Sequence, residues 1–370
     1  MSHRWIAART RAFDSSGIRK VFDLAANLGD PINLSIGQPD FDVPEPVKAA
    51  CIEAIEAGKN GYSVTQGIAP LRDALQSDVD RRFGHADRKV FVSSGSSGGL
   101  VLAMLALLDP GDEVIIFDPY FVMYVSLVQL AGGVPVLVDT YPSFELPLDR
   151  LSDFITPKTK MVLVNSPANP TGVVYDEATL RTLAELCAER NVLLVSDEIY
   201  RPFCYDRPFV SPASFNPDTL VIEGFSKSHG ITGWRVGYVH GPSELIDAMI
   251  KIQQYTFVCS PQPAQWGALA AVETDVSRHV DDYRRKRDRL LEALGEVYRF
   301  APAGGAFYLF AEAPGGSGTR FVEQAIENNL LVIPGNVFSR RDSHFRLSYA
   351  ASDAMIERGI EVLRKLAAAS

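Results

Sequence analysis

The segment from Gly224 to Tyr238 has the composition expected around a reactive amine. It reads Gly-Phe-Ser-Lys-Ser-His-Gly-Ile-Thr-Gly-Trp-Arg-Val-Gly-Tyr, so that Lys227 lies between two serines and Arg235 follows eight residues later. A single lysine is most often a solvated surface group, but this one is surrounded by small hydroxylic residues and glycines. The segment predicts that the Lys227 amine condenses with a carbonyl group while Arg235 holds an anion.

Three other segments place small or polar residues directly after apolar runs. Val92-Ser-Ser-Gly-Ser-Ser-Gly-Gly opens a helix-like stretch whose amides and hydroxyls suit a phosphate, although a flexible turn with serine caps is the alternative. It matches neither the Walker pattern nor GxGxxG, so a nucleotide is not the obvious ligand. Asn165-Ser-Pro-Ala-Asn-Pro-Thr-Gly predicts a fixed turn or an ordinary strand-to-helix loop. Ser196-Asp-Glu-Ile-Tyr places a carboxylate and a phenol after a strand, where a helix cap is the alternative.

A parallel sheet is the element that must position these segments. Between about residues 89 and 240, short apolar runs alternate with helical patterns such as Asp176 to Arg190. The predicted strands are residues 89–93, 113–117, 134–138, 160–165, 192–196 and 220–224. Because these runs are apolar on both faces, they predict an α/β domain with a mostly parallel sheet. Ligands bind such sheets at the carboxyl ends of the strands, where the polar segments lie.

The pattern changes beyond about residue 276. A charged helix is predicted from Val276 to Leu294, then a helix near 319–329, a strand over 344–348 and a last helix from about 352 to 367. These elements predict a smaller α+β domain, completed by the amino-terminal segment. We therefore expect a large domain over residues 45–275 and a small domain formed by residues 1–44 and 276–370.

Composition and charge exclude several classes of protein. The chain has 36 Lys and Arg residues against 45 Asp and Glu residues, a formal charge of −9, which argues against a nucleic-acid or anionic-lipid surface. Its four cysteines form no CxxC pair, so neither a disulfide framework nor a metal site is predicted. The longest apolar run, Gly98 to Leu108, is too short to span a bilayer, and the first ten residues lack the apolar stretch of a signal peptide. We expect a soluble, cytoplasmic protein.

The chemical segments together resemble the pyridoxal-phosphate (PLP) aminotransferases of fold type I, class I/II, and most closely the bacterial aspartate/aromatic subgroup. The motifs occur in the family's order and spacing from about Gly17 to the final helix. They are Leu34-Ser-Ile-Gly-Gln-Pro-Asp-Phe, Asn169-Pro-Thr-Gly, Asp197-Glu-Ile-Tyr200, Ser226-Lys227, Gly233-Trp-Arg235-Val-Gly and Phe345-Arg-Leu-Ser-Tyr-Ala. The resemblance implies an α/β fold whose large domain holds a mostly parallel seven-stranded sheet between helices.

The resemblance also implies how the cofactor, pyridoxal 5'-phosphate, is held. It makes Lys227 the catalytic lysine that binds the cofactor covalently. Asp197 would pair with the pyridinium nitrogen, Tyr200 and Asn169 would hydrogen-bond the phenolic oxygen, and Phe121 would stack on the ring. The phosphate would be held by Gly95, Ser96, Ser97, Ser226 and Arg235, and by Tyr62 of the neighbouring subunit. The active sites would then be shared within a homodimer.

The implied activity is transfer of the α-amino group of an L-amino acid to a 2-oxo acid by a ping-pong mechanism. Asp197 and Tyr200 would assist Lys227 in catalysis. Arg346 would bind the substrate α-carboxylate with two hydrogen bonds, beside Asn169, and Gly37 would close over it.

One position departs from the aspartate-selecting members of the subgroup. They carry a lysine that meets the distal carboxylate of the substrate, where this chain has Ser97. Arg19 and Arg201 are candidates to replace it. Tyr255 and Phe257 would suit aromatic or aliphatic substrates, or would pack at a dimer interface. Specificity for aspartate and a broad or aromatic specificity therefore both remain open.

Four other functions compete with this interpretation. A C–S β-lyase acting on cysteine conjugates, or a cyclopropane-forming synthase, would share nearly all the cofactor residues. An effector-sensing domain fused to a DNA-binding module would need a helix-turn-helix before Gly17, where the segment is too short. A nicotinamide dehydrogenase would need GxGxxG and would leave Lys227 unexplained.

Overall fold

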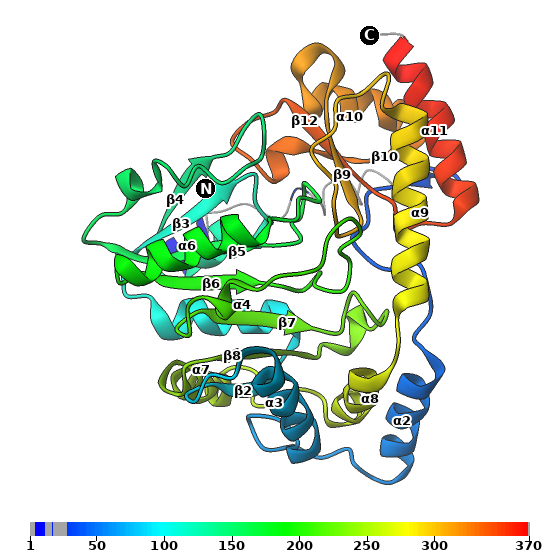
Figure 1. Cartoon of the computed structure of the whole chain (residues 1–370). Helices are drawn as coiled ribbons and strands as arrows, with labels where there is room; N and C mark the ends of the chain where they lie inside the picture. Colours follow the sequence, from blue (N-terminus) through cyan, green and yellow to red (C-terminus); the bar gives the residue numbers. More distant parts are fainter. Residues whose placement is uncertain (1–3, 12–16, 18–27, 369–370) are drawn as a thin grey trace.

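A seven-stranded sheet forms the centre of the larger part of the molecule (Figure 1). The computed structural model describes residues 4–11, 17 and 28–368. The strand order is β2-β8-β7-β6-β5-β3-β4, and every adjacent pair is parallel except the two that involve β8. The strands are β2 (Lys89–Ser93), β3 (Glu113–Asp118), β4 (Val134–Asp139), β5 (Thr159–Asn165), β6 (Leu193–Asp197), β7 (Leu220–Gly224) and β8 (Gly237–Gly241). The predicted α/β sheet is confirmed, and the six predicted runs agree with observed strands to within one residue at each end.

Helices cover both faces of this sheet because its strands are apolar on both sides. In β3, Val114 and Ile116 pack against one group of helices, whereas Ile115 and Phe117 pack on the opposite face. The first group comprises α4 (Gly95–Leu107), α5 (Met123–Leu130) and α7 (Ser243–Tyr255), and the opposite face is covered by α6 (Glu177–Glu189). A third cluster joins α2 (Glu45–Glu56), α3 (Ala69–Phe83) and α8 (Gln262–Glu273) to the β2–β8 edge.

The smaller part of the molecule is built on short strands and three long helices. Its antiparallel sheet has the order β11-β12-β9, and a separate parallel pair joins β1 to β10. The strands are β1 (Ile32–Asn33), β9 (Tyr308–Glu312), β10 (Leu330–Leu331), β11 (Ile333–Pro334) and β12 (His344–Ser348), and the helices are α9 (Ser277–Leu294), α10 (Gly318–Glu327) and α11 (Asp353–Ala368). Short 3-10 helices include η1 (Ala8–Arg11) and η4 (Thr232–Trp234).

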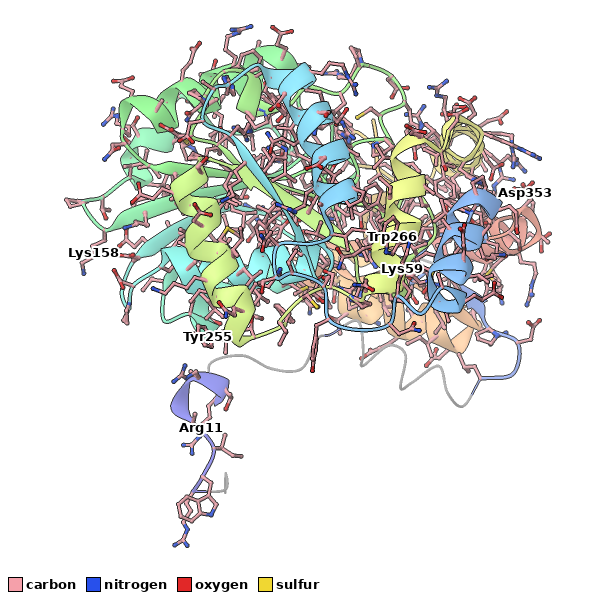
Figure 2. All side chains as sticks on the ribbon, turned by 90° about the horizontal axis from the view of Figure 1, so that it is seen from below. Arg11, Lys59, Lys158, Tyr255, Trp266 and Asp353 are labelled. Atoms are coloured by element: carbon pink, nitrogen blue, oxygen red, sulfur yellow. The ribbon has the colours of Figure 1, made fainter. Side chains whose placement is uncertain are left out.

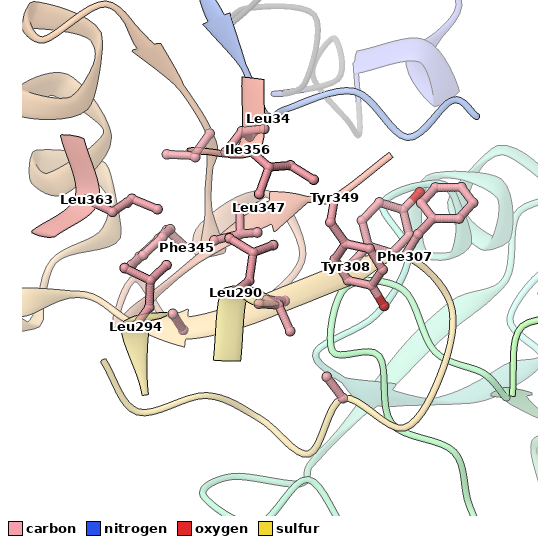
Figure 3. Close-up of a cluster of buried hydrophobic side chains, with 14 of the residues drawn as sticks. Leu34, Leu290, Leu294, Phe307, Tyr308, Phe345, Leu347, Tyr349, Ile356 and Leu363 are labelled. Carbon is pink, nitrogen blue, oxygen red and sulfur yellow. The ribbon is translucent and has the colours of Figure 1, made fainter. Parts of the chain in front are cut away.

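The amino-terminal segment contributes to the core of this smaller part. Leu34 lies in one hydrophobic cluster with Leu290 of α9, Leu347 of β12 and Ile356 of α11 (Figure 3). Ile32 pairs in register with Leu330, so the separate β1–β10 pair joins two segments nearly 300 residues apart in sequence. On this basis we propose the division into a large domain over 45–275 and a small domain formed by the described parts of 1–44 and 276–370.

The reversed strand β8 brings both ends of the lysine segment to one edge of the sheet. Gly224, the last residue of β7, pairs with Gly237, the first residue of β8. Residues 225–236 therefore form a closed connection at the carboxyl edge, and this connection carries Lys227 and Arg235. A Cβ atom on Gly237 would lie 2.6 Å from the backbone of Gly95 and Ser96, so glycine lets the start of α4 approach this edge.

None of the described helices is both long and apolar enough to cross a membrane. Within residues 4–11, 17 and 28–368, no group of three or more His, Cys, Asp or Glu side chains could hold a metal ion.

Candidate active site

A cavity of about 220 Å³ lies at the carboxyl edge of the large sheet, where the small domain faces it. Of the catalytic, cofactor-binding and α-carboxylate-binding residues predicted from the sequence, all except Gly95 and Tyr62 line it. Those that do are Gly37, Ser96, Ser97, Phe121, Asn169, Asp197, Tyr200, Ser226, Lys227, Arg235 and Arg346. Leu100, Tyr124, Asn165, Ile199, Thr232 and Tyr308 also line the cavity and were not predicted. Residues spread over 310 positions of sequence therefore meet in one space.

The Lys227 amine is buried in this cavity and held by a backbone carbonyl. Its Nζ donates a hydrogen bond of 2.5 Å to the carbonyl oxygen of Gly37, which follows β1. Burial, together with the neighbouring Arg346 and Arg235, lowers the pKa of Lys227 to about 8, and Asp197 opposes that shift. The amine is thus much easier to deprotonate than an ordinary lysine, which favours its use as a nucleophile or base.

Asp197, the last residue of β6, is a buried carboxylate with specific donors. The hydroxyl of Tyr124 donates to its Oδ2 at 2.7 Å, and the amide of Ile199 donates to its Oδ1 at 3.3 Å. Burial raises the pKa of Asp197 to about 6, while these two hydrogen bonds and Lys227 oppose the rise. The group is therefore mostly charged at neutral pH and is suited to pair with a protonated nitrogen in the cavity.

Tyr124 is a site residue that sequence reasoning missed. It lies on α5, three positions after Phe121, and the two rings meet edge to face with centroids 5.6 Å apart. Phe121 lies just before the helix, and the amide of Tyr124 donates to its carbonyl oxygen at 3.0 Å, so their closeness in sequence is the signal that could have placed both rings in the site. From the sequence alone, Tyr124 could not be distinguished from an ordinary core tyrosine, because the partner of its hydroxyl, Asp197, is distant in sequence.

Arg346, in the middle of β12, is fully enclosed yet only partly satisfied. Its Nη1 donates to Asn169 Oδ1 at 2.9 Å and its Nη2 to the carbonyl oxygen of Ser35 at 2.8 Å. Only 1% of the residue is exposed, and no described group accepts a hydrogen bond from its Nε. The guanidinium lies over the rings of Tyr308 and Phe338, with its Cζ 4.4 and 4.5 Å from their centroids. This is a buried cation that lines the cavity with a free donor, as a carboxylate receptor requires.

Arg235 and the first turn of α4 form the anion-binding end of the cavity. Arg235 has a left-handed backbone (φ 58°), and its Nη1 donates to the carbonyl oxygen of Thr232 at 2.9 Å. Gly95 has φ +68°, and a Cβ atom there would lie 2.6 Å from Arg235 Nη2. Gly95 therefore lies against the arginine, although it does not line the cavity. Ser96 and Ser97 follow at the amino terminus of the helix, where free amides and the helix dipole favour an anion.

Tyr200 meets a second tyrosine that the sequence did not single out. The hydroxyls of Tyr200 and Tyr308 lie 2.8 Å apart, and both side chains are buried. Burial raises the pKa of Tyr200 well above its usual value, and the nearby Tyr308 adds to the rise. Tyr308 lies between the predicted helix that ends at Leu294 and the one near residues 319–329, in a segment for which neither an element nor a site role was predicted.

The two arginines considered as replacements for the missing lysine differ in outcome. Arg201 does not face the cavity, so its candidacy is wrong. Its Nε lies 2.9 Å from Oε2 of the buried Glu223. The two side chains line a different cavity, together with Phe225 and Ser228 of the lysine segment. Arg19 lies outside the described residues.

Three predicted aromatic residues do not line the cavity of their own chain. Tyr62 and Tyr255 are 86% and 80% exposed, and Phe257 is 38% exposed. Figure 2 shows Tyr255 at the lower side of the view, from which the segment carrying Arg11 also extends. Tyr62 stays a predicted contributor to the neighbouring subunit's site, and Tyr255 and Phe257 stay predicted to line a substrate side-chain pocket or to pack at a dimer interface.

Residues 29–363 match the sequence model of aminotransferase class I and II. The chain belongs to this family. A probable aspartate aminotransferase of Methanocaldococcus jannaschii is 37% identical over 98% of this chain and 99% of its own length. An aspartate/prephenate aminotransferase of Thermus thermophilus is 38% identical, with 92% of both chains covered. The solved structure of a Thermus thermophilus aspartate aminotransferase with maleate superposes with a TM-score of 0.93 at 36% identity, covering 98% of this chain and 100% of that one.

These similarities confirm the predicted family and fold type, and they make the protein a PLP-dependent aminotransferase. Because these relatives are named as aminotransferases, the alternative of a C–S lyase is not favoured. The cavity fits the cofactor on its own chemistry. It combines a buried amine for the aldehyde, a buried carboxylate for the ring nitrogen and an arginine-lined helix terminus for the phosphate.

The depressed pKa of Lys227 predicts where the cofactor becomes attached and at what pH. Cofactor-free aminotransferase mixed with PLP and reduced with borohydride should be labelled at Lys227. The labelling should rise with pH through about 8, because the neutral amine is the reactive form. Peptide mapping by mass spectrometry across pH 6–10 measures this directly.

The exposed Lys158 reports general amine reactivity in the same samples. Lys227→Ala should still bind PLP without forming the reduced adduct. A reduced adduct at another cavity residue, or a Lys227 profile that rises only near pH 10, would contradict the assignment.

Proposed function

We propose that this aminotransferase transfers the α-amino group of an L-amino acid to a 2-oxo acid through two half-reactions in the cavity around Lys227. The observation that supports this most directly is the buried Arg346 guanidinium beside a buried lysine amine. The guanidinium can bind the α-carboxylate of an amino acid, and the lysine amine can take up the proton of the adjoining Cα. Every α-amino acid except those without a Cα proton offers these two groups.

We infer that different cavity residues would hold different groups of the cofactor. Lys227 would bind its aldehyde, and Asp197, held by Tyr124, would pair with the ring nitrogen. Tyr200 and Asn169 would hydrogen-bond the phenolic oxygen. Phe121 would contact the ring, and Gly95, Ser96, Ser97, Ser226 and Arg235 would hold the phosphate. When bound, PLP supplies an aldehyde and an electron-withdrawing ring.

The protein's own groups then account for binding and proton transfer. Arg346 holds the substrate α-carboxylate and so fixes the direction of the Cα–H bond relative to Lys227. Lys227 Nζ, with its pKa lowered to about 8, takes up the Cα proton as a general base. Gly37, whose carbonyl oxygen accepts from this amine, places the amino-terminal segment over the same carboxylate. Because these groups are buried, water is kept away from the reacting atoms.

We propose a broad donor specificity that includes both aspartate and aromatic amino acids. Aspartate is supported by the relatives, of which one is named a probable aspartate aminotransferase and another an aspartate/prephenate aminotransferase. Neutral side chains are supported by the described cavity lining. Its only cations are Lys227, Arg235 and Arg346, and each already has a proposed task. Ser97 and Leu100 are neutral, and Ser97 stands where aspartate-selecting members of the subgroup carry the lysine that meets the distal carboxylate.

Mixing PLP-loaded enzyme with single amino acids, without an oxo acid, tests this proposal. We expect the visible absorption of the lysine-bound cofactor to give way to that of the amine form, with the matching 2-oxo acid released. A suitable panel is aspartate, glutamate, phenylalanine, alanine and cystathionine, and phenylalanine should react as well as aspartate. Persistence of the visible band together with ammonia and pyruvate would instead indicate a lyase.

Arg346→Ala should lower kcat/KM for every amino acid in that panel by about 10²- to 10⁴-fold, because two charged hydrogen bonds to the α-carboxylate are lost. Stopped-flow measurement of the half-reaction gives these values. Arg299→Ala is the matched control, since that side chain lies in the small domain and is 82% exposed. A loss confined to aspartate and glutamate would mean that Arg346 reads the distal carboxylate.

We further propose that the enzyme is a cytoplasmic homodimer with shared active sites. Tyr62, Val64, Tyr255 and Val258 are large apolar side chains with 86%, 55%, 80% and 42% exposure, as expected for a surface that a second copy covers. All four cysteines of the chain are unpaired, which suits a reducing compartment.

Mixed dimers test whether Tyr62 acts in the neighbouring site. Lys227→Ala and Tyr62→Ala should each be impaired alone. Random exchange of their subunits should restore about a quarter of wild-type activity, because half of the dimers then hold one intact site. Sedimentation should show a dimer throughout. Failure to restore activity despite subunit exchange would place Tyr62 in its own chain's site or in neither.

A further inference from the structure

Tyr308 touches three parts of the site that come from three separate regions of the chain. It is the first residue of β9, pairs in register with Ser348 of β12 and is 1% exposed. Figure 3 places it at the edge of the hydrophobic cluster of the small domain, beside Phe307 and Tyr349. Unlike those two side chains, it lines the cavity.

Its hydroxyl is paired with the phenol that faces the cofactor. Tyr308 Oη lies 2.8 Å from Tyr200 Oη, and the two rings meet edge to face with their centroids 5.7 Å apart and an interplanar angle of 83°. A phenol in this position fixes where the Tyr200 hydroxyl lies and which lone pair stays available. Tyr200 itself comes from the large domain, so the contact joins the two domains at the site.

The ring and the hydroxyl of Tyr308 have further neighbours. The Arg346 guanidinium lies over the ring, with Cζ 4.4 Å from its centroid. The hydroxyl lies so close to Gly37 that a Cβ there would be 2.4 Å away. The same side chain therefore supports the proposed carboxylate receptor with its face and adjoins the closing segment with its polar end.

We propose that Tyr308 is a positioning residue of the aminotransferase, which acts through Tyr200 on the cofactor's phenolic oxygen and through Arg346 on the substrate carboxylate. This inference rests on the proposed function, because it takes the roles of Tyr200 and Arg346 from there. The two actions are separable, since the hydroxyl serves Tyr200 and the ring serves Arg346.

Tyr308→Phe removes the hydroxyl and keeps the ring. We take Tyr308 to donate to Tyr200 in the PLP-loaded protein, which leaves the Tyr200 hydrogen for the cofactor's phenolic oxygen. The pH midpoint of the visible absorption change should then rise by about 0.5–1 pH unit, because Tyr200 loses a hydrogen bond that strengthens its own donation. Tyr200→Phe should raise the midpoint further. In a Tyr200→Phe background, adding Tyr308→Phe should cause no additional shift. KM for amino acids should change by less than about threefold, because the ring over Arg346 is retained.

Tyr308→Leu removes the ring as well and should raise KM in addition to shifting the midpoint. Tyr298→Phe is the matched control. It deletes another buried hydroxyl of the same cluster, bonded to the carbonyl oxygen of Leu363 at 2.8 Å, and should leave the midpoint unchanged. Thermal unfolding of each cofactor-free variant separates loss of stability from loss of positioning.

The outcomes distinguish the inference from the function on which it rests. If Tyr200→Phe shifts the midpoint and Tyr308→Phe does not, the role of Tyr308 is overturned and the proposed function stands. An additive shift in the double variant would also overturn it, since Tyr308 would not act through Tyr200. If neither variant moves the midpoint, the assignment of Tyr200 to the cofactor fails and the inference fails with it.

Discussion

The burial of opposite charges in one small cavity is the constraint on which the rest of the site depends. Lys227, Asp197 and Arg346 are all removed from water, and an unpaired charge in such a place costs several kcal/mol or changes its protonation state. Each group therefore has an assigned hydrogen-bond partner. The pKa values of Lys227 and Asp197 are thereby shifted to about 8 and about 6, which is the range in which an enzyme can move protons, whereas Arg346 stays a cation.

These partners are supplied by backbone and by distant segments, so packing decides the electrostatics. The carbonyl groups of Ser35 and Gly37 hold Arg346 and Lys227, and both lie just after Leu34. Leu34 is buried in the hydrophobic cluster of the small domain, and a Cβ on Gly359 of α11 would meet it at 2.6 Å. Loss of that packing would therefore displace the two carbonyl groups and weaken their hydrogen bonds to Arg346 and Lys227. The hydrophobic core of the small domain and the chemistry of the site are parts of one arrangement.

Much of this could be predicted from the sequence because the decisive signals are local. Apolar runs with polar ends revealed six strands of the large sheet and the loops that follow them, and the segment around Lys227 is unusual in composition. Strand β8 was not recognised as a run of its own, since Gly237-Tyr-Val-His-Gly is short and bounded by glycines. Its antiparallel pairing depends on long-range contacts rather than on local pattern.

The site residues that were missed, and the arginine that was wrongly considered, are positioned by contacts with residues far away in the sequence. Tyr124 and Tyr308 are buried among core residues, and only the folded positions of Asp197 and Tyr200 show what their hydroxyls contact. Arg201 looked available for a substrate carboxylate, but Glu223 and Asp78 lie on its side of the segment.

Because β8 runs antiparallel to β7, the number of residues between Phe225 and Val236 is constrained more strictly than the type of residue at each position. Both ends of this connection are tied by the Gly224–Gly237 pair, and the start of α4 rests on one of them. An inserted residue would have to bulge outward or displace either the amine or the guanidinium that the connection carries. Insertions and deletions should therefore be rare here, whereas exchange of side chains at a position such as Gly233, which has open space around it, should be tolerated.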